Sequence, residues 1–381
     1  MNLDSKLPRV GTTIFTRMSA MAAEHRAINL SQGFPDFDAP EALREALARA
    51  VMDGYNQYAP MAGLPALREQ LALQLKLHRD INCNPDTEIT IVPGATEGIF
   101  CAVMACVRPG DEVIVLDPCY DSYEPAIELA GGRAVHVPLQ APDFSPDWQQ
   151  VAAVITPRSR MIMVNSPHNP TGTSLSREDL DHLEALATRH DLLVCSDEVY
   201  EHLVYDGDSH HSVLQWPGLR ERSFAHFSFG KTFSVTGWKT GYCVAPPALT
   251  AELRKVHQFV AFVAVTPVQK AVADFLAAEP GYPATLGRFY QRKRDLFCKA
   301  LAESRFAIRP SSGTYFQLLD YGAITDTPDH QLCEQWTCEH GVASIPISIF
   351  YQQAPEQTLL RFCFAKSDEV LLRAAEILCK I

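Results

Sequence analysis

The sequence predicts an α/β protein with a largely parallel sheet that is covered by helices on both faces. From residue 88 on, short apolar runs rich in β-branched residues alternate with stretches of helical periodicity. The apolar runs are continuous, which is typical of parallel strands buried on both faces. The chain has 381 residues, of which 47% are hydrophobic and 20% charged, so it can bury a full core and has room for two domains.

The expected elements follow one another in a regular order. Helices are expected at 95–107, 121–132 and 177–190, each after one of the apolar runs. Strands are expected at 88–92, 111–116, 134–139, 160–165, 191–196, 223–229 and 241–245.

The pattern changes beyond residue 248. Long helical stretches at 250–265 and 283–304 are followed by an alternating tail, with strands near 314–320 and 359–365. This tail indicates a smaller α+β unit, and we take residue 285 as a nominal divide.

Composition excludes several classes of function. A net charge of -12 and a pI near 5.5 argue against nucleic acid as a partner, because nucleic-acid binders normally carry a basic face. The N-terminus has no apolar run of signal-peptide or membrane-spanning length, so we expect no membrane association and a cytoplasmic location. The 11 cysteines form no C-x-x-C pair and the 13 histidines no H-E-x-x-H motif, so a metal site has little support.

Polar residues follow several of the expected strands. "IVPGATEG" (91–98) ends a strand and opens a helix, so the N–H groups of Ala95 and Thr96 can hold an anion. "LVCSDEVYEHL" (193–203) brings Asp197 to a carboxyl end of the sheet, where open α/β sheets bind ligands. Each stretch also has a bland structural explanation, because Gly94 can make a simple turn and Asp197 can cap a helix.

"NSPHNPTG" (165–172) makes a rigid loop that can present Asn169 at the same edge, although a simple turn explains it nearly as well.

One further stretch, "AHFSFGKT" (225–232), nearly matches the P-loop pattern G-x-x-x-x-G-K-[ST], with Ala225 in place of the first glycine. A nucleotide hydrolase is therefore an alternative of a different class. The loop positions are bulky, however, and "FSVTGWKTGY" after them has β-branched residues and glycines unsuited to the helix that a P-loop requires. We disfavour this alternative.

A single cofactor, pyridoxal phosphate, explains all these stretches. A lysine in a loop between strands can form a Schiff base with its aldehyde, and an anion must keep its ring nitrogen protonated. Lys231 and Asp197 suit these two tasks. The other groups require donors to the phenolic oxygen, a ring to stack on and N–H groups or cations for the phosphate. The residues available for them are Asn169, Tyr200, Tyr120, Ala95, Thr96, Ser228 and Lys239.

The sequence resembles the fold-type I, pyridoxal phosphate-dependent aminotransferases of the class I/II group over nearly its whole length. The matching motifs stand in family order: "LSQGFPDF" (30–37), "NQYAPMAGLPALREQLA" (56–72), "PGATEGI" (93–99), "DPCYDSY" (117–123), "NSPHNPTG" (165–172), "SDEVYEHL" (196–203), "SFGKTFSVTGWKTGY" (228–242) and "LLRFCFAKS" (359–367).

This resemblance implies a fold with two domains. A large cofactor-binding domain at 45–285 would contain a mostly parallel seven-stranded sheet between helices. A smaller α+β domain would be formed by both termini, at 1–44 and 286–381.

The resemblance also implies a role for each motif residue. Lys231 would bond the cofactor and shuttle the proton, Asp197 would pair with the ring nitrogen, and Tyr200 and Asn169 would bond the phenolic oxygen. The other implied roles are ring stacking by Tyr120, phosphate binding by Gly94, Ala95, Thr96, Ser228 and Lys239, α-carboxylate binding by Arg361, Asn169 and Gly33, and a phosphate contact from Tyr58 of a second subunit in a homodimer with shared active sites.

Two positions stand apart from this scheme. Lys239 occupies a place where many relatives have arginine, so it keeps the charge and loses the bidentate geometry. This variation resembles the kynurenine/glutamine and methionine aminotransferase branch. His168 beside Asn169 receives no role.

The expected reaction moves an amino group from an L-amino acid to a 2-oxo acid. Phe34, Phe15, Tyr123 and "IPISIFY" (345–351) suggest apolar walls that favour methionine, glutamine, phenylalanine or kynurenine over aspartate. Two alternatives share the machinery. One is β-elimination from cysteine conjugates. The other is a transcription regulator, which needs a DNA-binding domain for which the 30 residues before Ser31 are too few.

Overall fold

The computed structural model describes residues 4–381 and contains a seven-stranded sheet in the order β2-β8-β7-β6-β5-β3-β4. All neighbouring strands are parallel except that β8 runs antiparallel to both β2 and β7. The expected α/β class and mostly parallel sheet are confirmed. The strands are β2 (Ile89–Val92), β3 (Glu112–Asp117), β4 (Arg133–Pro138), β5 (Ser159–Asn165), β6 (Leu193–Asp197), β7 (Ser223–Ser228) and β8 (Gly241–Val244).

Successive residues of these strands enter different apolar cores on the two faces of the sheet. In β3, Val113 and Val115 lie in one core, whereas Ile114 and Leu116 lie in the other. Because a strand points alternate side chains to opposite faces, a strand covered on both sides must be apolar throughout. The strands of this sheet accordingly read as unbroken hydrophobic runs.

Helices supply the other half of each core. One core contains residues of α4 (Ala95–Cys106), α5 (Tyr123–Leu129) and α10 (Pro247–Val260). The opposite core contains residues of α2 (Glu41–Met52), α3 (Pro65–Arg79), α6 (Trp148–Ala153), α7 (Arg177–Arg189), η1 (Val213–Gln215), α8 (Pro217–Arg220), α9 (Phe229–Thr232) and α11 (Thr266–Ala278).

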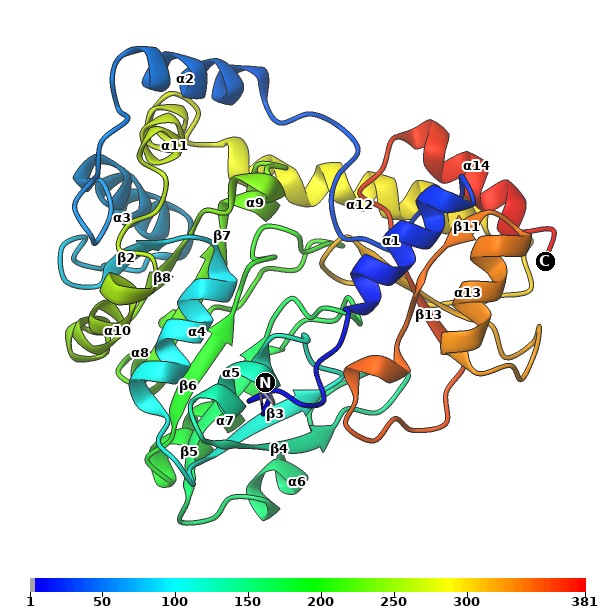
Figure 1. Cartoon of the computed structure of the whole chain (residues 1–381), viewed down its shortest axis with the longest axis horizontal. Coiled ribbons are helices and arrows are strands. Elements are labelled where there is room, and N and C mark those ends of the chain that lie inside the picture. Colours follow the sequence, from blue (N-terminus) through cyan, green and yellow to red (C-terminus); the bar gives the residue numbers. More distant parts are fainter. Residues whose placement is uncertain (1–3) are drawn as a thin grey trace.

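A second group of elements lies beside this sheet (Figure 1). Its largest sheet has four strands in the order β12-β13-β10-β9, and β1 pairs with β11 in a second small sheet. Segments from both ends of the chain share its core, which includes Met18 and Leu378. The elements are α1 (Ile14–Glu24), β1 (Ile28–Asn29), α12 (Tyr282–Ala300), β9 (Ala307–Ile308), β10 (Phe316–Asp320), α13 (Asp329–Glu339), β11 (Val342–Ala343), β12 (Ile345–Pro346), η3 (Ser348–Phe350), β13 (Leu359–Cys363) and α14 (Asp368–Leu378).

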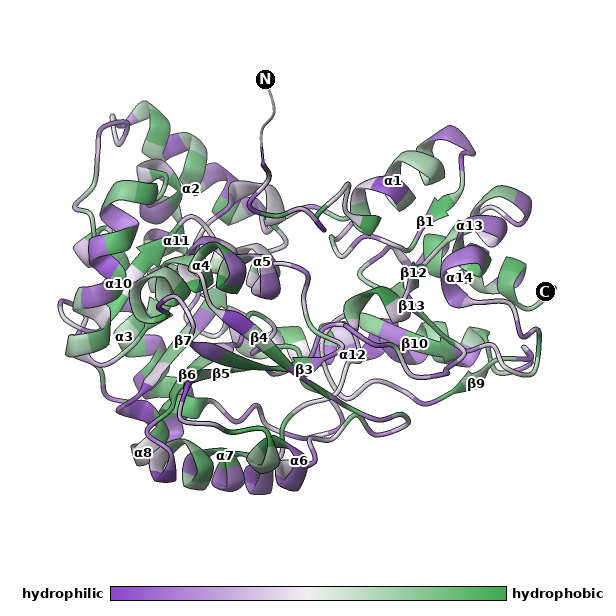
Figure 2. Ribbon diagram, turned by 60° about the horizontal axis from the view of Figure 1, so that its bottom comes forward, coloured by the Kyte–Doolittle hydropathy of each residue, from purple (hydrophilic) through white to green (hydrophobic). Residues whose placement is uncertain are grey.

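Helix α12 connects the two groups and extends alongside both in Figure 1. Its first residue, Tyr282, packs against the core beneath the large sheet and also against the core of the second group. Helix α2 belongs with the large sheet, because Leu43 is part of that core. The division at residues 44 and 285 stays a prediction. Hydropathy coloured on the ribbon shows apolar strands between helices that are polar on their outer faces (Figure 2).

One helix ends earlier than expected. The apolar periodicity predicts a helix through residue 265, but α10 ends at Val260 and Phe262 adopts a positive φ of 67°. Phe259 near the end of α10 is exposed, as are Phe262 and Val265 in the connection to α11. No helix among residues 4–381 is long and apolar enough to cross a bilayer.

Candidate active site

A cavity of about 510 Å³ lies where the parallel strands end. Strands β5, β6 and β7 end at Asn165, Asp197 and Ser228, and all three residues line it. Strand β8 runs the other way, so the residues just before it, Lys239 and Thr240, reach the same edge. The topology therefore brings together polar residues that are far apart in the sequence.

Asp197 is the buried acid at the end of β6. Its Oδ2 accepts a 2.6 Å hydrogen bond from Tyr123 Oη, and its Oδ1 accepts one of 3.3 Å from Val199 N. Burial raises the pKa of Asp197 to about 6, although these two donors oppose the rise. The carboxylate forms no ion pair among residues 4–381, so it suits a cationic partner in the cavity.

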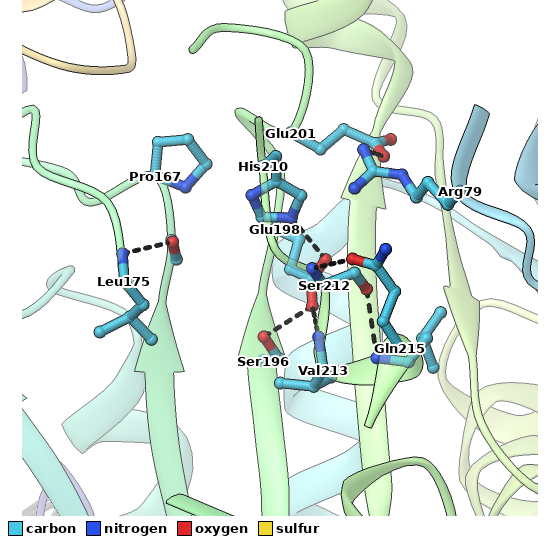
Figure 3. Close-up of polar contacts among 12 residues, drawn as sticks. Arg79, Pro167, Leu175, Ser196, Glu198, Glu201, His210, Ser212, Val213 and Gln215 are labelled. Atoms are coloured by element: carbon cyan, nitrogen blue, oxygen red, sulfur yellow. Dashed lines mark hydrogen bonds and ion pairs between the residues drawn. The ribbon is translucent and has the colours of Figure 1, made fainter. Parts of the chain in front are cut away.

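Glu198, the residue after Asp197, holds the end of β6 in place through several polar contacts (Figure 3). The buried Glu198 Oε1 accepts hydrogen bonds from Ser196 Oγ at 3.0 Å and Val213 N at 3.1 Å. Its Oε2 lies 2.8 Å from His210 Nε2. These contacts fix the backbone on both sides of Asp197, and interactions with His210 keep the pKa of Glu198 below its usual range despite burial.

Lys231 enters the cavity from α9, directly after β7. Its Nζ donates to Tyr315 Oη at 2.8 Å and to the Gly33 carbonyl at 3.3 Å. Burial lowers the pKa of Lys231 to about 8, and the charges of Lys239 and Arg361 act in the same direction. A lysine whose neutral form is accessible near neutral pH is suited to act as a nucleophile and as a base.

The start of α4 offers an anion site. Gly94 adopts a φ of 88°, no side chain caps the helix, and Ala95 and Thr96 line the cavity. A Cβ placed on Gly94 would lie 3.6 Å from Lys239 Nζ, so the ammonium group lies close to this helix start. Uncapped N–H groups, the helix dipole and a lysine together favour a phosphate.

Arg361 in β13 is a buried cation with a vacant donor. Its Nη1 donates to Asn169 Oδ1 at 2.6 Å and its Nη2 to the Ser31 carbonyl at 2.8 Å, while its Nε has no partner. The guanidinium carbon lies 3.9 Å from the centroid of the Phe316 ring. Burial lowers the pKa of Arg361 to about 10, and no carboxylate of residues 4–381 pairs with it. An anionic ligand would satisfy this charge.

Gly33 and two phenylalanines complete the cavity near Arg361. Phe15 and Phe34 line it, and the Phe15 ring lies 5.2 Å from the Arg361 guanidinium carbon. A Cβ on Gly33 would approach Phe316 Cζ to 2.6 Å, so this position requires glycine for space.

Two expectations about the walls need correction. Tyr123 does not line the cavity, because its side chain instead donates its hydroxyl to Asp197. The segment 345–351 is also absent from the lining, and its Phe350 packs behind Phe15 at a centroid distance of 5.9 Å.

The other predicted site residues fall into two groups. Tyr120, Asn169 and Tyr200 line the cavity with those described above. Tyr58 does not: it is 81% exposed on the outside of the chain. His168 also lies outside the lining, with its Nδ1 2.7 Å from Thr171 Oγ1, and burial lowers its pKa to about 4.

Sequence reasoning missed Tyr315 and gave no role to Asn165. Tyr315 Oη bonds both Lys231 and Gly33 O, but in the sequence it is one aromatic residue within an expected strand. Asn165 Nδ2 donates to the Asp197 carbonyl at 2.8 Å and thus joins the ends of β5 and β6. Its place at the end of an expected strand was the available signal.

The residues present fit pyridoxal phosphate. The cavity combines an unpaired buried carboxylate, a lysine with a lowered pKa, a tyrosine ring and an uncapped helix start next to Lys239. These are the groups required by its ring nitrogen, aldehyde, ring face and phosphate. The P-loop alternative finds no support, because the helix at this motif, α9 (Phe229–Thr232), begins before Gly230 and ends one residue after Lys231.

Comparisons with known proteins find similar chains over nearly the whole length of this one. Residues 25–378 match the family described as aminotransferase class I and II. The chain is 51% identical to methionine aminotransferase of Escherichia coli, over 98% of this chain and 96% of that protein. It is 34% identical to kynurenine–oxoglutarate transaminase of Dictyostelium discoideum, over 97% and 94%. An Escherichia coli crystal structure reported with a methionine aminotransferase function covers 100% of both chains at a TM-score of 0.98 and 50% identity.

Proposed function

The chain belongs to the class I and II aminotransferases, and from that premise we propose that it moves the amino group of an apolar, sulfur-containing or aromatic L-amino acid to a 2-oxo acid. As a member of this family it is a pyridoxal phosphate-dependent enzyme. The preferred donors in this proposal are methionine, glutamine, phenylalanine or a kynurenine-like amino acid. The names of the methionine and kynurenine relatives support this range.

The cofactor supplies an aldehyde that bonds amines and a protonated ring that accepts electrons from the substrate α-carbon. Lys231 is the proposed amine that holds it. Gly94, Ala95 and Thr96 at the start of α4, with Ser228 and Lys239, bind its phosphate.

Three residues are proposed to hold the ring in place. Tyr120 lies against the ring face, and Asn169 and Tyr200 donate to the phenolic oxygen. All three line the cavity that also contains Lys231.

Proton transfer is assigned to Lys231 Nζ. With the substrate bound in the cavity, the neutral amine of Lys231 would remove the α-proton and would later return a proton as the product forms. Its pKa of about 8 allows both steps, since the group is partly neutral near pH 7. Tyr315, which accepts its hydrogen bond, keeps Nζ directed into the cavity.

Two charged groups orient the reaction. Asp197 pairs with the proton on the ring nitrogen, and that pairing provides the cation that its buried carboxylate lacks. Arg361 binds the α-carboxylate with its vacant Nε and its Nη donors, and the rings of Phe316 and Phe15 lie against its guanidinium. Asn169 and Gly33 border the same carboxylate.

The observation that carries this proposal is the convergence of Lys231, Asp197 and Arg361 on one cavity. We expect the enzyme with bound pyridoxal phosphate to transfer the amino group of methionine and phenylalanine to 2-oxo acids at rates well above that of aspartate, because the walls beside Arg361 are apolar. A panel of amino donors against several 2-oxo acids, with products measured by chromatography, checks this.

Two results of that panel would contradict the proposal. Equal rates with aspartate and methionine would exclude the apolar donor range. Pyruvate and ammonia released from a cysteine conjugate faster than any amino transfer would make β-elimination the main reaction of the site.

We further propose that two copies of the chain form a homodimer with shared active sites. Exposed apolar side chains support this, with Met52 and Phe259 each 85% exposed and Tyr58 81% exposed. Tyr58 and Phe262 also contact each other edge to face, with centroids 5.2 Å apart. Exposed apolar side chains of this size are typical of an interface.

Mixing two inactive variants tests the shared site. Lys231→Ala removes the amine of a subunit's own site, whereas Tyr58→Ala removes the residue proposed to serve the partner's site. A mixed dimer has one site with both side chains intact, so about a quarter of all sites should be restored by random reassembly. Activity that stays at the sum of the two separate variants, or sedimentation as a monomer, would rule out shared sites.

A further inference from the structure

The cavity is lined by more charged residues than the proposed function uses. Lys231, Lys239, Asp197 and Arg361 each have a partner in that scheme: the cofactor aldehyde, its phosphate, its ring nitrogen and the substrate α-carboxylate. One charged residue of the lining remains, and it is Asp121.

Asp121 is a carboxylate without a partner. Its side chain forms no ion pair and no hydrogen bond to another of residues 4–381, and it is exposed to the cavity and to solvent. Partial burial raises the pKa of Asp121, and the nearby charge of Arg361 opposes this rise. Asp121 directly follows Tyr120, whose ring is proposed to stack on the cofactor, so the Cα atoms of the two residues are about 3.8 Å apart.

We propose that Asp121 is a specificity-determining residue, whose carboxylate disfavours amino donors and 2-oxo acid acceptors with a carboxylate in the side chain. The proposal rests on the proposed function and deepens it by naming the excluded substrate class. Both half-reactions use one site, so the exclusion applies to glutamate as donor and to 2-oxoglutarate as acceptor.

Apolar walls alone would produce a different pattern. Phe15 and Phe34 disfavour a charged side chain most and an amide less, because burying either one costs free energy, and this cost depends little on salt. A nearby carboxylate repels only another negative charge, and the repulsion is weakened by salt. Glutamine and glutamate have nearly the same size and shape, so the change in their ratio when the charge of Asp121 is removed, with its dependence on salt, separates the two effects.

The test compares Asp121→Asn with Asp121→Glu in the enzyme loaded with pyridoxal phosphate. We expect Asp121→Asn to lower the glutamine-to-glutamate ratio of kcat/KM about fivefold at low salt, which is the scale of one partly solvated charge pair. The ratio measured with 2-oxoglutarate and an uncharged 2-oxo acid of similar length should change likewise. Asp121→Glu keeps the charge and should keep the ratio.

The control is Asp326→Asn, which removes the same charge from an exposed residue outside the cavity lining. It should leave the ratio at its original value. The effect of Asp121→Asn should also shrink at high salt, which a change of shape would not do.

The outcomes separate this inference from the proposed function. If Asp121→Asn changes glutamine and glutamate equally, or neither, Asp121 does not set specificity while amino transfer from methionine still stands. If the loaded parent enzyme transfers no amino group from any donor, the proposed function itself fails.

Discussion

Lys231→Ala is expected to lower amino transfer by about 10⁴-fold or more, because it removes both a nucleophile and a general base. Its Nζ is held in the cavity by hydrogen bonds to Tyr315 Oη and to Gly33 O, which Lys239 does not make among residues 4–381. The variant should also lose the bond to pyridoxal phosphate that borohydride reduces. Mass spectrometry of the reduced protein checks this without any measurement of activity.

Lys239→Ala is the matched control for that experiment. Lys239 lines the same cavity and lies close to the α4 start, so its loss should weaken cofactor retention. At saturating cofactor, this variant should still give the reduced adduct on Lys231. An adduct that disappears with Lys239 and persists without Lys231 would reverse the two roles.

The strands could be predicted from the sequence because a strand buried on both faces accepts almost only apolar residues. Each of the seven expected strands overlaps a strand of the large sheet, within about two residues at either end. Residues at the ends of these strands, such as Asp197 and Ser228, could be assigned to the site because their strands were predictable. A parallel sheet places the carboxyl ends of its strands at one edge.

Side-chain direction was less accessible. Tyr123 was expected as a wall, yet the burial of Asp197 requires a donor, and the Tyr123 hydroxyl satisfies it from behind. Tyr315 is similar, because only the approach of β10 to Gly33 turns an ordinary strand residue into the partner of Lys231. Both contacts depend on residues more than 70 positions apart, which no local pattern reveals.

Asp197→Asn is expected to lower amino transfer by about 10³-fold, the scale of losing a preorganised charge in an enclosed site. Asparagine has the same shape, but it carries no charge to hold the proton on the ring nitrogen. The variant should still form the borohydride-reducible adduct, because Lys231 is unchanged. Activity within tenfold of the parent would show that Asp197 is not the partner of the ring nitrogen.

The same substitution should stabilise the protein without cofactor, in a manner that depends on pH. Burial raises the pKa of Asp197 from 3.8 to about 6, so the folded chain favours the neutral acid. The stability that this form contributes is present below pH 3.8 and is lost as the pH rises through 6. At pH 8, removing the buried charge should therefore stabilise the cofactor-free chain by roughly 3 kcal/mol. At pH 5 the gain should be smaller, because Asp197 is then mostly protonated. Thermal unfolding of both proteins at the two pH values measures this difference in stability. An equal gain at pH 5 and pH 8 would mean that burial does not raise the pKa of Asp197.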